Sequence, residues 1–310
     1  MKFASRFNSF MHDEQKTFEK VIINMAGISE LHAVDLNYPE HFSGNNVQNM
    51  KEIMKKNGIM LNGIATRFRD EYINGELGNP DNSISDKALT LCYESVDICR
   101  EMGGKVVTIW LGYDGYDYSF QLDYLKAWKK VILAFRKICD YAHDIQISIE
   151  YKPFQPRVFS LISSLGDTMT MLHEIDRPNL GVTLDFCHML MKGENPAFAV
   201  SLLADKNRLF GIHLNDGNHL NDDGLMVGMT NFIQTLEFMF YLKKENYEGV
   251  IYFDTFPIRE NEVKECEANI QMVKQLDKMI ERVGIERIQK VIDQNNALEV
   301  QKLMLEFLNP

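Results

Sequence analysis

Residues 147–150 read I-S-I-E, a short apolar run that ends in a carboxylate. The run is β-branched and turn-forming residues follow it, which predicts a buried β-strand. Three later runs have the same form: L-G-V-T-L-D at 180–185, L-F-G-I-H at 209–213 and V-I-Y-F-D at 250–254. We therefore expect four strands that each end in a residue able to bind a hard divalent cation.

The rest of the chain repeats the same unit, a strand followed by a helix. Strand-like segments lie at 3–9, 32–38, 60–68, 105–112, 146–152, 180–187, 209–215 and 249–256. Eight such units predict an α/β fold, a single (β/α)8 TIM barrel, over residues 1–281. Helical sequence continues from about Glu286 to Leu308. We expect residues 282–310 to form a C-terminal helical extension that packs on the barrel or on a neighbouring subunit.

The four strand ends predict a metal site. Parallel strands in a barrel place their carboxyl ends on one rim, so the terminal side chains should converge. The residues concerned are Glu150, Asp185, His213 and Asp254. Three carboxylates and one imidazole suit Mn²⁺, Mg²⁺ or Co²⁺ better than structural Zn²⁺. Mn²⁺ is the leading expectation, and Mg²⁺, Co²⁺ and Zn²⁺ are the alternatives.

Composition disfavours several classes of protein. The net charge of −11 disfavours nucleic acid as a partner. No run approaches the ~18 apolar residues of a membrane span, and the first residues lack the apolar core of a signal peptide, so we expect a cytoplasmic protein without a membrane partner. No glycine-rich phosphate loop follows the first strand, so no nucleotide cofactor is expected. The five cysteines are scattered and are interpreted as reduced and mostly buried.

Further polar residues lie close to the predicted ligands. Glu150 and Lys152 share one face of their strand, either as a structural ion pair or as part of a site in the barrel mouth. His188 follows Asp185 by three residues and is placed in the first turn of a loop, where it is either structural or a ligand.

The loop 217–228 contains adjacent aspartates. Asp222 and Asp223 could be ordinary turn residues, because turns favour Asp, Asn and Gly. Beside a metal centre they become candidates for a second ion.

These motifs resemble the xylose isomerase-like barrel superfamily of sugar isomerases and epimerases, which includes L-rhamnose isomerase-like and D-tagatose 3-epimerase-like enzymes. The resemblance rests on E-Y-K-P at 150–153, D-F-C-H at 185–188, H-L-N-D at 213–216 with D-D-G-L-M-V-G at 222–228, and the aspartate of Y-F-D-T-F-P at 252–257. It implies that the four strand-end residues hold one metal and that Glu150, Lys152 and Asp254 are catalytic.

The resemblance also implies roles for neighbouring residues. His188, Asp222 and Asp223 would hold a second metal, although Gly224 departs from the family pattern, and Lys152 and His188 would contact the sugar. Trp110 would form an aromatic wall for the sugar, with core packing as the alternative. Arg67 is a further substrate-binding candidate. Because Arg67, Arg69 and Arg157 all lie near predicted rim loops, a phosphorylated substrate remains an alternative.

The leading functional hypothesis is a divalent-metal-dependent isomerase that interconverts aldose and ketose forms of a monosaccharide. The main competing hypothesis is a keto-sugar 3-epimerase, in which the strand-eight acid resembles a glutamate, so that Asp254 favours the isomerase. Less favoured hypotheses are an inosose-type isomerase or dehydratase, an apurinic-site endonuclease and a non-catalytic sugar-binding barrel. The helical tail favours a homodimer or homotetramer.

Overall fold

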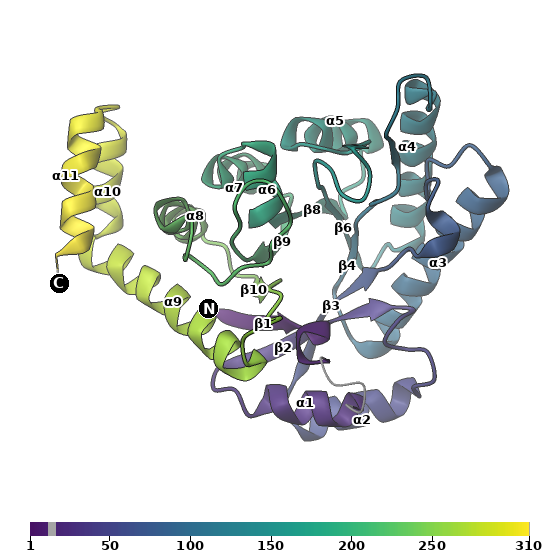
Figure 1. The fold of residues 1–310 in the computed structure, drawn as a ribbon, viewed down its shortest axis with the longest axis horizontal. Helices are drawn as coiled ribbons and strands as arrows, with labels where there is room; N and C mark the ends of the chain where they lie inside the picture. The colour runs from purple at the N-terminus through teal and green to yellow at the C-terminus, as the bar shows by residue number, and fades with distance from the viewer. Residues whose placement is uncertain (12–16, 310) are drawn as a thin grey trace.

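The computed structural model describes residues 1–11 and 17–309. Residues 12–16 of the predicted barrel and Pro310 of the predicted extension lie outside the described residues. Eight parallel strands close into a barrel in the order β1-β10-β9-β8-β6-β4-β3-β2 (Figure 1). They are β1 (Lys2–Arg6), β2 (Leu31–Tyr38), β3 (Met60–Thr66), β4 (Val106–Ile109), β6 (Gln146–Glu150), β8 (Leu180–Asp185), β9 (Leu209–Leu214) and β10 (Val250–Phe253). The predicted TIM barrel is confirmed.

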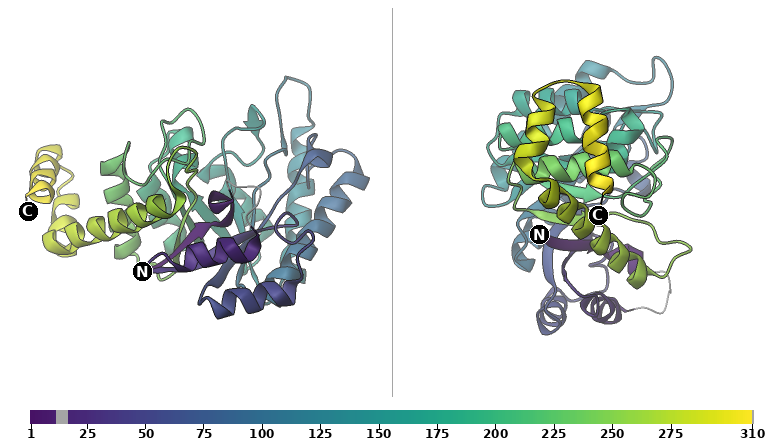
Figure 2. Two further views of the ribbon diagram at one scale, coloured as in Figure 1. Left: turned by 60° about the horizontal axis from the view of Figure 1, so that its bottom comes forward. Right: turned by 90° about the vertical axis from the view of Figure 1, so that its left-hand side faces the viewer.

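Helices follow the strands and surround the barrel (Figure 1 and Figure 2). They are α1 (Phe18–Ala26), α2 (Val47–Lys56), α3 (Asn82–Met102), α4 (Tyr124–Tyr141), α5 (Leu165–Ile175), α6 (Phe186–Lys192), α7 (Pro196–Asp205), α8 (Phe232–Lys244) and α9 (Glu262–Val283). Most begin after a residue whose side chain accepts a backbone hydrogen bond, as Asp81 does for α3 and Asn261 for α9. None of the helices in the described ranges is long and apolar enough to cross a membrane.

Some element boundaries differ from the sequence prediction. The first strand ends at Arg6 rather than residue 9, because Phe7–Phe10 turn into the 3₁₀ helix η1 and bury Phe7 and Phe10. A second 3₁₀ helix, η2, spans Asp70–Tyr72. The strand that begins at Leu180 ends at Asp185 rather than residue 187, because Phe186 already starts α6.

A small antiparallel sheet outside the barrel was not predicted. It pairs β5 (Gly115–Tyr116) with β7 (Phe159–Ser160) and joins the loops that follow β4 and β6. A Cβ atom on Gly115 would lie 2.1 Å from the carbonyl oxygen of Phe159, so this close approach requires glycine. The sheet fixes two rim loops to each other.

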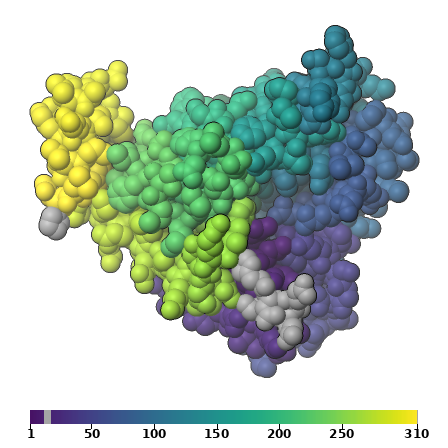
Figure 3. Space-filling view, in the orientation of Figure 1, coloured from purple at the N-terminus to yellow at the C-terminus, as the bar shows by residue number. Residues whose placement is uncertain are grey.

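The C-terminal segment forms two helices, α10 (Ile285–Ile292) and α11 (Ala297–Leu308). α9 ends before Gly284, which has a φ of 88°, so the chain changes direction there. Both helices contact α9 and stand at one end of the molecule (Figure 2 and Figure 3). Arg282 donates a hydrogen bond to the carbonyl oxygen of Phe307, and Arg287 forms an ion pair with Glu306. These contacts tie the end of α11 to α9 and α10.

Candidate metal centre and sugar pocket

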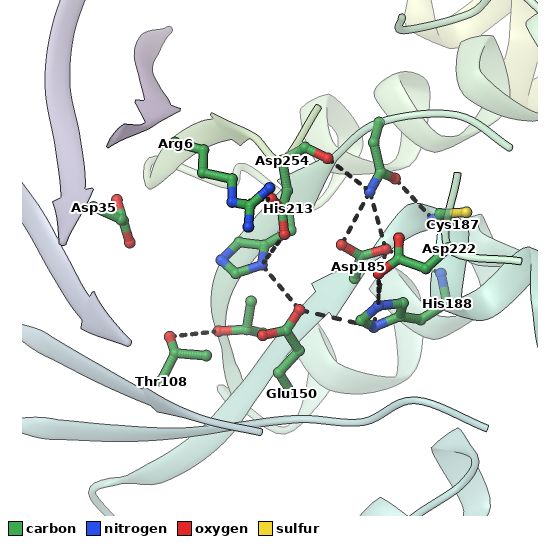
Figure 4. A network of polar contacts seen from close by, with 12 residues as sticks. Arg6, Asp35, Thr108, Glu150, Asp185, Cys187, His188, His213, Asp222 and Asp254 are labelled. Atoms are coloured by element: carbon green, nitrogen blue, oxygen red, sulfur yellow. Dashed lines mark hydrogen bonds and ion pairs between the residues drawn. The ribbon is translucent and has the colours of Figure 1, made fainter. Parts of the chain in front are cut away.

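The four predicted ligands lie together at the carboxyl rim of the barrel (Figure 4). Glu150 and Asp185 are the last residues of β6 and β8, His213 is the penultimate residue of β9, and Asp254 follows β10. One ligand atom from each lies within 4.8 Å of the others. Glu150, Asp185 and His213 are buried, and Asp254 is half-buried. The strand ends therefore form one compact donor set.

His213 stands between two of the carboxylates. Its Nδ1 lies 3.1 Å from Oε1 of Glu150 and 3.8 Å from Oδ2 of Asp254. Burial would raise the pKa of Glu150, but the charge of His213 and its hydrogen bond lower that pKa to about 2. Burial would likewise lower the pKa of His213, but Glu150 raises it to about 9. Without a metal, this raised pKa favours the protonated imidazole, whose charge offsets the carboxylates.

Asn215, which the sequence pattern did not identify, orients the carboxylate of Asp185. Its Nδ2 donates to Oδ1 and Oδ2 of Asp185 at 3.3 and 3.1 Å and to the carbonyl oxygen of Asp254 at 3.2 Å. Its Oδ1 accepts the backbone N–H of Cys187 at 2.9 Å. Asn215 is completely buried. The Asn215 side chain therefore fixes the carboxylate of Asp185 relative to the backbone of Asp254.

The donor set fits a divalent cation. Oδ1 of Asp254 is buried and lacks a hydrogen-bond partner among the described residues. Burial raises the pKa of Asp185 to about 7, with the neighbouring carboxylates adding to the effect. A divalent ion would offset these crowded charges, and the oxygen-rich set with one imidazole matches Mn²⁺ or Mg²⁺. Glu150, Asp185, His213 and Asp254 are the residues that would hold it.

A second cluster of possible metal ligands lies beside the first and shares Asp185 with it. Ligand atoms of Asp185, His188 and Asp222 lie within 4.8 Å of one another. Nζ of Lys152 lies 2.9 Å from Oδ2 of Asp222, so an ammonium already neutralises this carboxylate. Asp223 does not join the group, because its Oδ2 accepts the backbone N–H of Asn218 at 2.7 Å within its own loop. Of the residues predicted for a second metal, the structure brings together only His188 and Asp222.

His188 lies in a helix and not in the predicted loop. Oδ1 of Asp185 accepts the backbone N–H of His188 at 3.0 Å and thereby caps α6. The ring is buried, with Nδ1 3.0 Å from the carbonyl oxygen of Tyr151 and Nε2 3.3 Å from Oδ2 of Asp222. Both ring nitrogens are engaged, so the imidazole fixes the position of Asp222.

The candidate metal centre opens into a pocket of about 210 Å³. Trp110 lines it, with Nζ of Lys152 5.1 Å and Cζ of Arg67 5.8 Å from its ring centroid. A Cβ atom on Gly112 would lie 2.8 Å from the same ring, so the indole packs against this glycine. Trp110 and Arg67, both predicted to contact substrate, therefore lie at the pocket beside Lys152.

Arg6 and Asp35 also line the pocket and were not singled out from the sequence. Nε of Arg6 lies 3.5 Å from Oδ1 of Asp254, and its guanidinium covers the ring of Phe256 at 4.6 Å. Asp35 accepts a hydrogen bond from Asn62 at 2.7 Å, and burial raises its pKa to about 7. A prediction that ended the first strand at Arg6 would have placed that residue on the rim.

The three arginines that were considered as binding groups for a phosphorylated substrate occupy different places. Arg67 and Arg69 line the pocket. Arg157 instead forms an ion pair with Asp117 and donates to the carbonyl oxygen of Tyr113 at 3.1 Å. It joins the loops after β4 and β6 and does not line the pocket.

Comparisons with known proteins agree with this fold. Residues 26–276 match the model of the xylose isomerase-like TIM barrel family. A xylose isomerase of Thermus thermophilus is 27% identical over 221 residues, which cover 69% of this chain and 57% of that enzyme. The chain therefore spans little more than half the length of this curated relative.

Solved structures share the fold. A D-tagatose 3-epimerase-like protein superposes with a TM-score of 0.72 at 21% identity, covering 90% of this chain and 100% of that one. A D-allulose 3-epimerase from Methylomonas sp., in complex with D-allulose, gives a TM-score of 0.73 at 17% identity and covers 89% and 96%. The barrel, its strand-end residues and the match over most of the chain lead to one conclusion: the chain belongs to the xylose isomerase-like TIM barrel family.

Proposed function

We propose that the chain is a divalent-metal-dependent isomerase that interconverts the aldose and ketose forms of a monosaccharide. The observation that carries this proposal is the quartet Glu150, Asp185, His213 and Asp254, which faces a pocket that also contains Lys152. The similarity to a xylose isomerase supports it. The ion to test first is Mn²⁺, because the donor set is rich in oxygen.

A divalent ion in the quartet would supply Lewis-acid stabilisation of the negative charge that builds on two neighbouring sugar oxygens. The protein's own groups bind and orient the sugar. The ammonium of Lys152, buried at the pocket wall, donates a hydrogen bond to a sugar oxygen. Oδ1 of Asp222 is buried and has no hydrogen-bond partner within the described ranges, so it accepts a hydrogen bond from a sugar hydroxyl. His188 holds Asp222 in that position.

A keto-sugar 3-epimerase is the second candidate, and one feature of the site favours it. Glu150 and Asp254 both line the pocket, so its wall carries two carboxylates that could act on one sugar carbon. Paired carboxylates can remove a proton from one face of a carbon and return it to the other. The shorter side chain of Asp254 reduces its reach and favours the isomerase.

A substrate screen separates the two candidates. Purified Mn²⁺-loaded protein is incubated with a panel of aldoses, ketoses and inososes, and the products are followed by NMR. Aldose–ketose interconversion supports the isomerase. Inversion at C3 of a ketose without aldose formation would replace it with the epimerase.

Variants separate an enzyme from a sugar-binding barrel. Glu150→Gln should lower both turnover and Mn²⁺ content, because it removes a buried ligand. Asp144→Asn is the matched control, since it changes an exposed carboxylate that pairs with Arg100. A wild-type protein that binds sugar and Mn²⁺ but converts none of the panel would exclude the isomerase and the epimerase.

A further inference from the structure

The pocket has a cationic side formed by three arginines. Arg6 ends β1, Arg67 follows β3, and Arg69 lies two residues further on; all three line the pocket. β1 and β3 flank β2 in the barrel, whereas the predicted metal ligands come from β6, β8, β9 and β10. The arginines therefore gather on the side of the rim formed by β1 to β3, where Asp35 of β2 also lines the pocket, and Arg6 borders Asp254 because β1 pairs with β10.

In two of these arginines the Nε atom lacks a hydrogen-bond partner among the described residues. Arg69 forms an ion pair with Glu40, so its charge is offset. Nε of Arg6 and Nε of Arg67 are buried, and neither has a hydrogen-bond partner in the described part of the chain. The carboxylate nearest Arg6 is Asp254, one of the predicted metal ligands. A cation in the quartet would engage Asp254 and leave Arg6 with less to balance it.

The three arginines all act on the charge of one buried histidine, His41. His41 is buried, and its Nδ1 accepts the backbone N–H of Asn37 at 2.9 Å. Burial lowers the pKa of His41 to about 4, and Arg67, Arg6 and Arg69 add to this effect against the opposing charge of Glu40. Their fields therefore converge on one region of the rim.

We propose that Arg6 and Arg67 form a subsite for an anionic group on the substrate, a carboxylate or a phosphate, so that the sugar is a uronate or a sugar phosphate. The planar guanidinium group binds both kinds of anion through paired N–H donors, and its burial is costly while those donors stay unused. A neutral hydroxyl would satisfy fewer donors and none of the charge. This inference names the substrate class of the proposed isomerase and rests on that function.

The first experiment uses matched triplets: a neutral hexose, its uronate and its 6-phosphate, each given to the Mn²⁺-loaded full chain. We expect kcat/KM for one charged member to exceed that of the neutral sugar by at least ~10-fold, as a charge-assisted hydrogen bond provides. The uronate and phosphate arms identify which anion the subsite accepts. Equal or better turnover of the neutral sugar would overturn the inference.

The second experiment assigns the effect to the arginines. Arg67→Gln and Arg6→Gln should each raise KM for the charged sugar by ~10- to 100-fold with a smaller effect on kcat. Arg67→Lys keeps the positive charge but not the paired N–H donors of the guanidinium group, so its KM for the charged sugar should lie between those of the wild type and Arg67→Gln. It replaces Arg67→Gln in the test if that variant is unstable. Arg100→Gln, a surface arginine paired with Asp144, should change nothing. Equal effects on neutral and charged sugars would count against the subsite.

A binding measurement separates this inference from the isomerase proposal. Inorganic phosphate and D-glucuronate are titrated calorimetrically into Mn²⁺-loaded wild type, Arg67→Gln and Arg100→Gln. Anion binding that is lost only in Arg67→Gln supports the subsite even if no sugar is converted, in which case the isomerase proposal alone fails. Turnover of neutral sugars with anion binding that is the same in all three proteins leaves the isomerase in place and removes the subsite.

Discussion

Nζ of Lys152 lies 2.9 Å from Oδ2 of Asp222, within the group of residues that was predicted to hold a second metal. Two cations cannot both approach one carboxylate at short range without repulsion. Asp223 points into its own loop, and Gly224 offers no ligand side chain. The relationship favours one tightly bound ion rather than two.

We therefore expect one Mn²⁺ per chain after dialysis, measured by elemental analysis. Lys152→Met removes the ammonium, so the affinity of a second, weaker metal site should rise by about tenfold. This is the scale expected when one repulsive charge is removed from a partly buried site. Lys87→Met, on the surface of α3, is the control and should leave the metal content unchanged. Two tightly held ions in the wild type would refute the single-ion arrangement.

Metal affinity should depend steeply on pH. Without a metal the pKa of His213 is raised to about 9 and that of Asp185 to about 7, so at neutral pH the imidazole is protonated and the carboxyl is about half protonated, and a metal must displace these protons. Affinity should rise with pH by up to ~10-fold per unit for each proton released, and level off above about pH 9. Calorimetry in buffers of different ionisation enthalpy measures the protons directly. A binding heat independent of the buffer would contradict this expectation.

Asn215 should matter for the metal although it is not one of the four predicted ligands. Asn215→Ala removes the donors that hold Asp185, so we expect metal affinity to fall by ~10- to 100-fold with the four ligands intact. Competition with a chromogenic chelator measures the affinity. Asn179→Ala also removes hydrogen bonds of a partly buried amide, but at the amino end of β8, so it should lower stability without the change in affinity. Equal metal affinity in the two variants would show that Asn215 has no such role.

The C-terminal helices should mediate self-association. α10 and α11 stand at one end of the molecule and expose Leu298, Leu305 and Leu308. Exposed apolar side chains of this kind are typical of subunit contacts. A chain truncated after Val283 should therefore show a smaller mass in light scattering than the full chain. If both forms scatter as monomers, the helices have another role.

The sequence predicted the strands that carry the candidate ligands, because each apolar run stops at a polar residue and a parallel barrel places such residues on one rim. It did not locate Arg6, because F-N-S-F after it continues the apolar pattern and the turn into η1 depends on burial of Phe7 and Phe10. Asn215 was missed because an amide beside a candidate ligand produces no periodic pattern in the sequence. Helix α6 was missed because the side chain of Asp185 serves both as a site carboxylate and as a helix cap.

The pairing of β5 with β7 has a consequence for anyone who would redesign the pocket. Tyr116 stacks on Phe159 with ring centroids 5.0 Å apart, and Leu161 donates its backbone N–H to the carbonyl oxygen of Asp114 at 2.9 Å. The loop that follows Trp110 and the loop that follows Lys152 thus form one structural unit. Replacing one loop alone would break the backbone pairing of β5 with β7, so the two loops should be exchanged together.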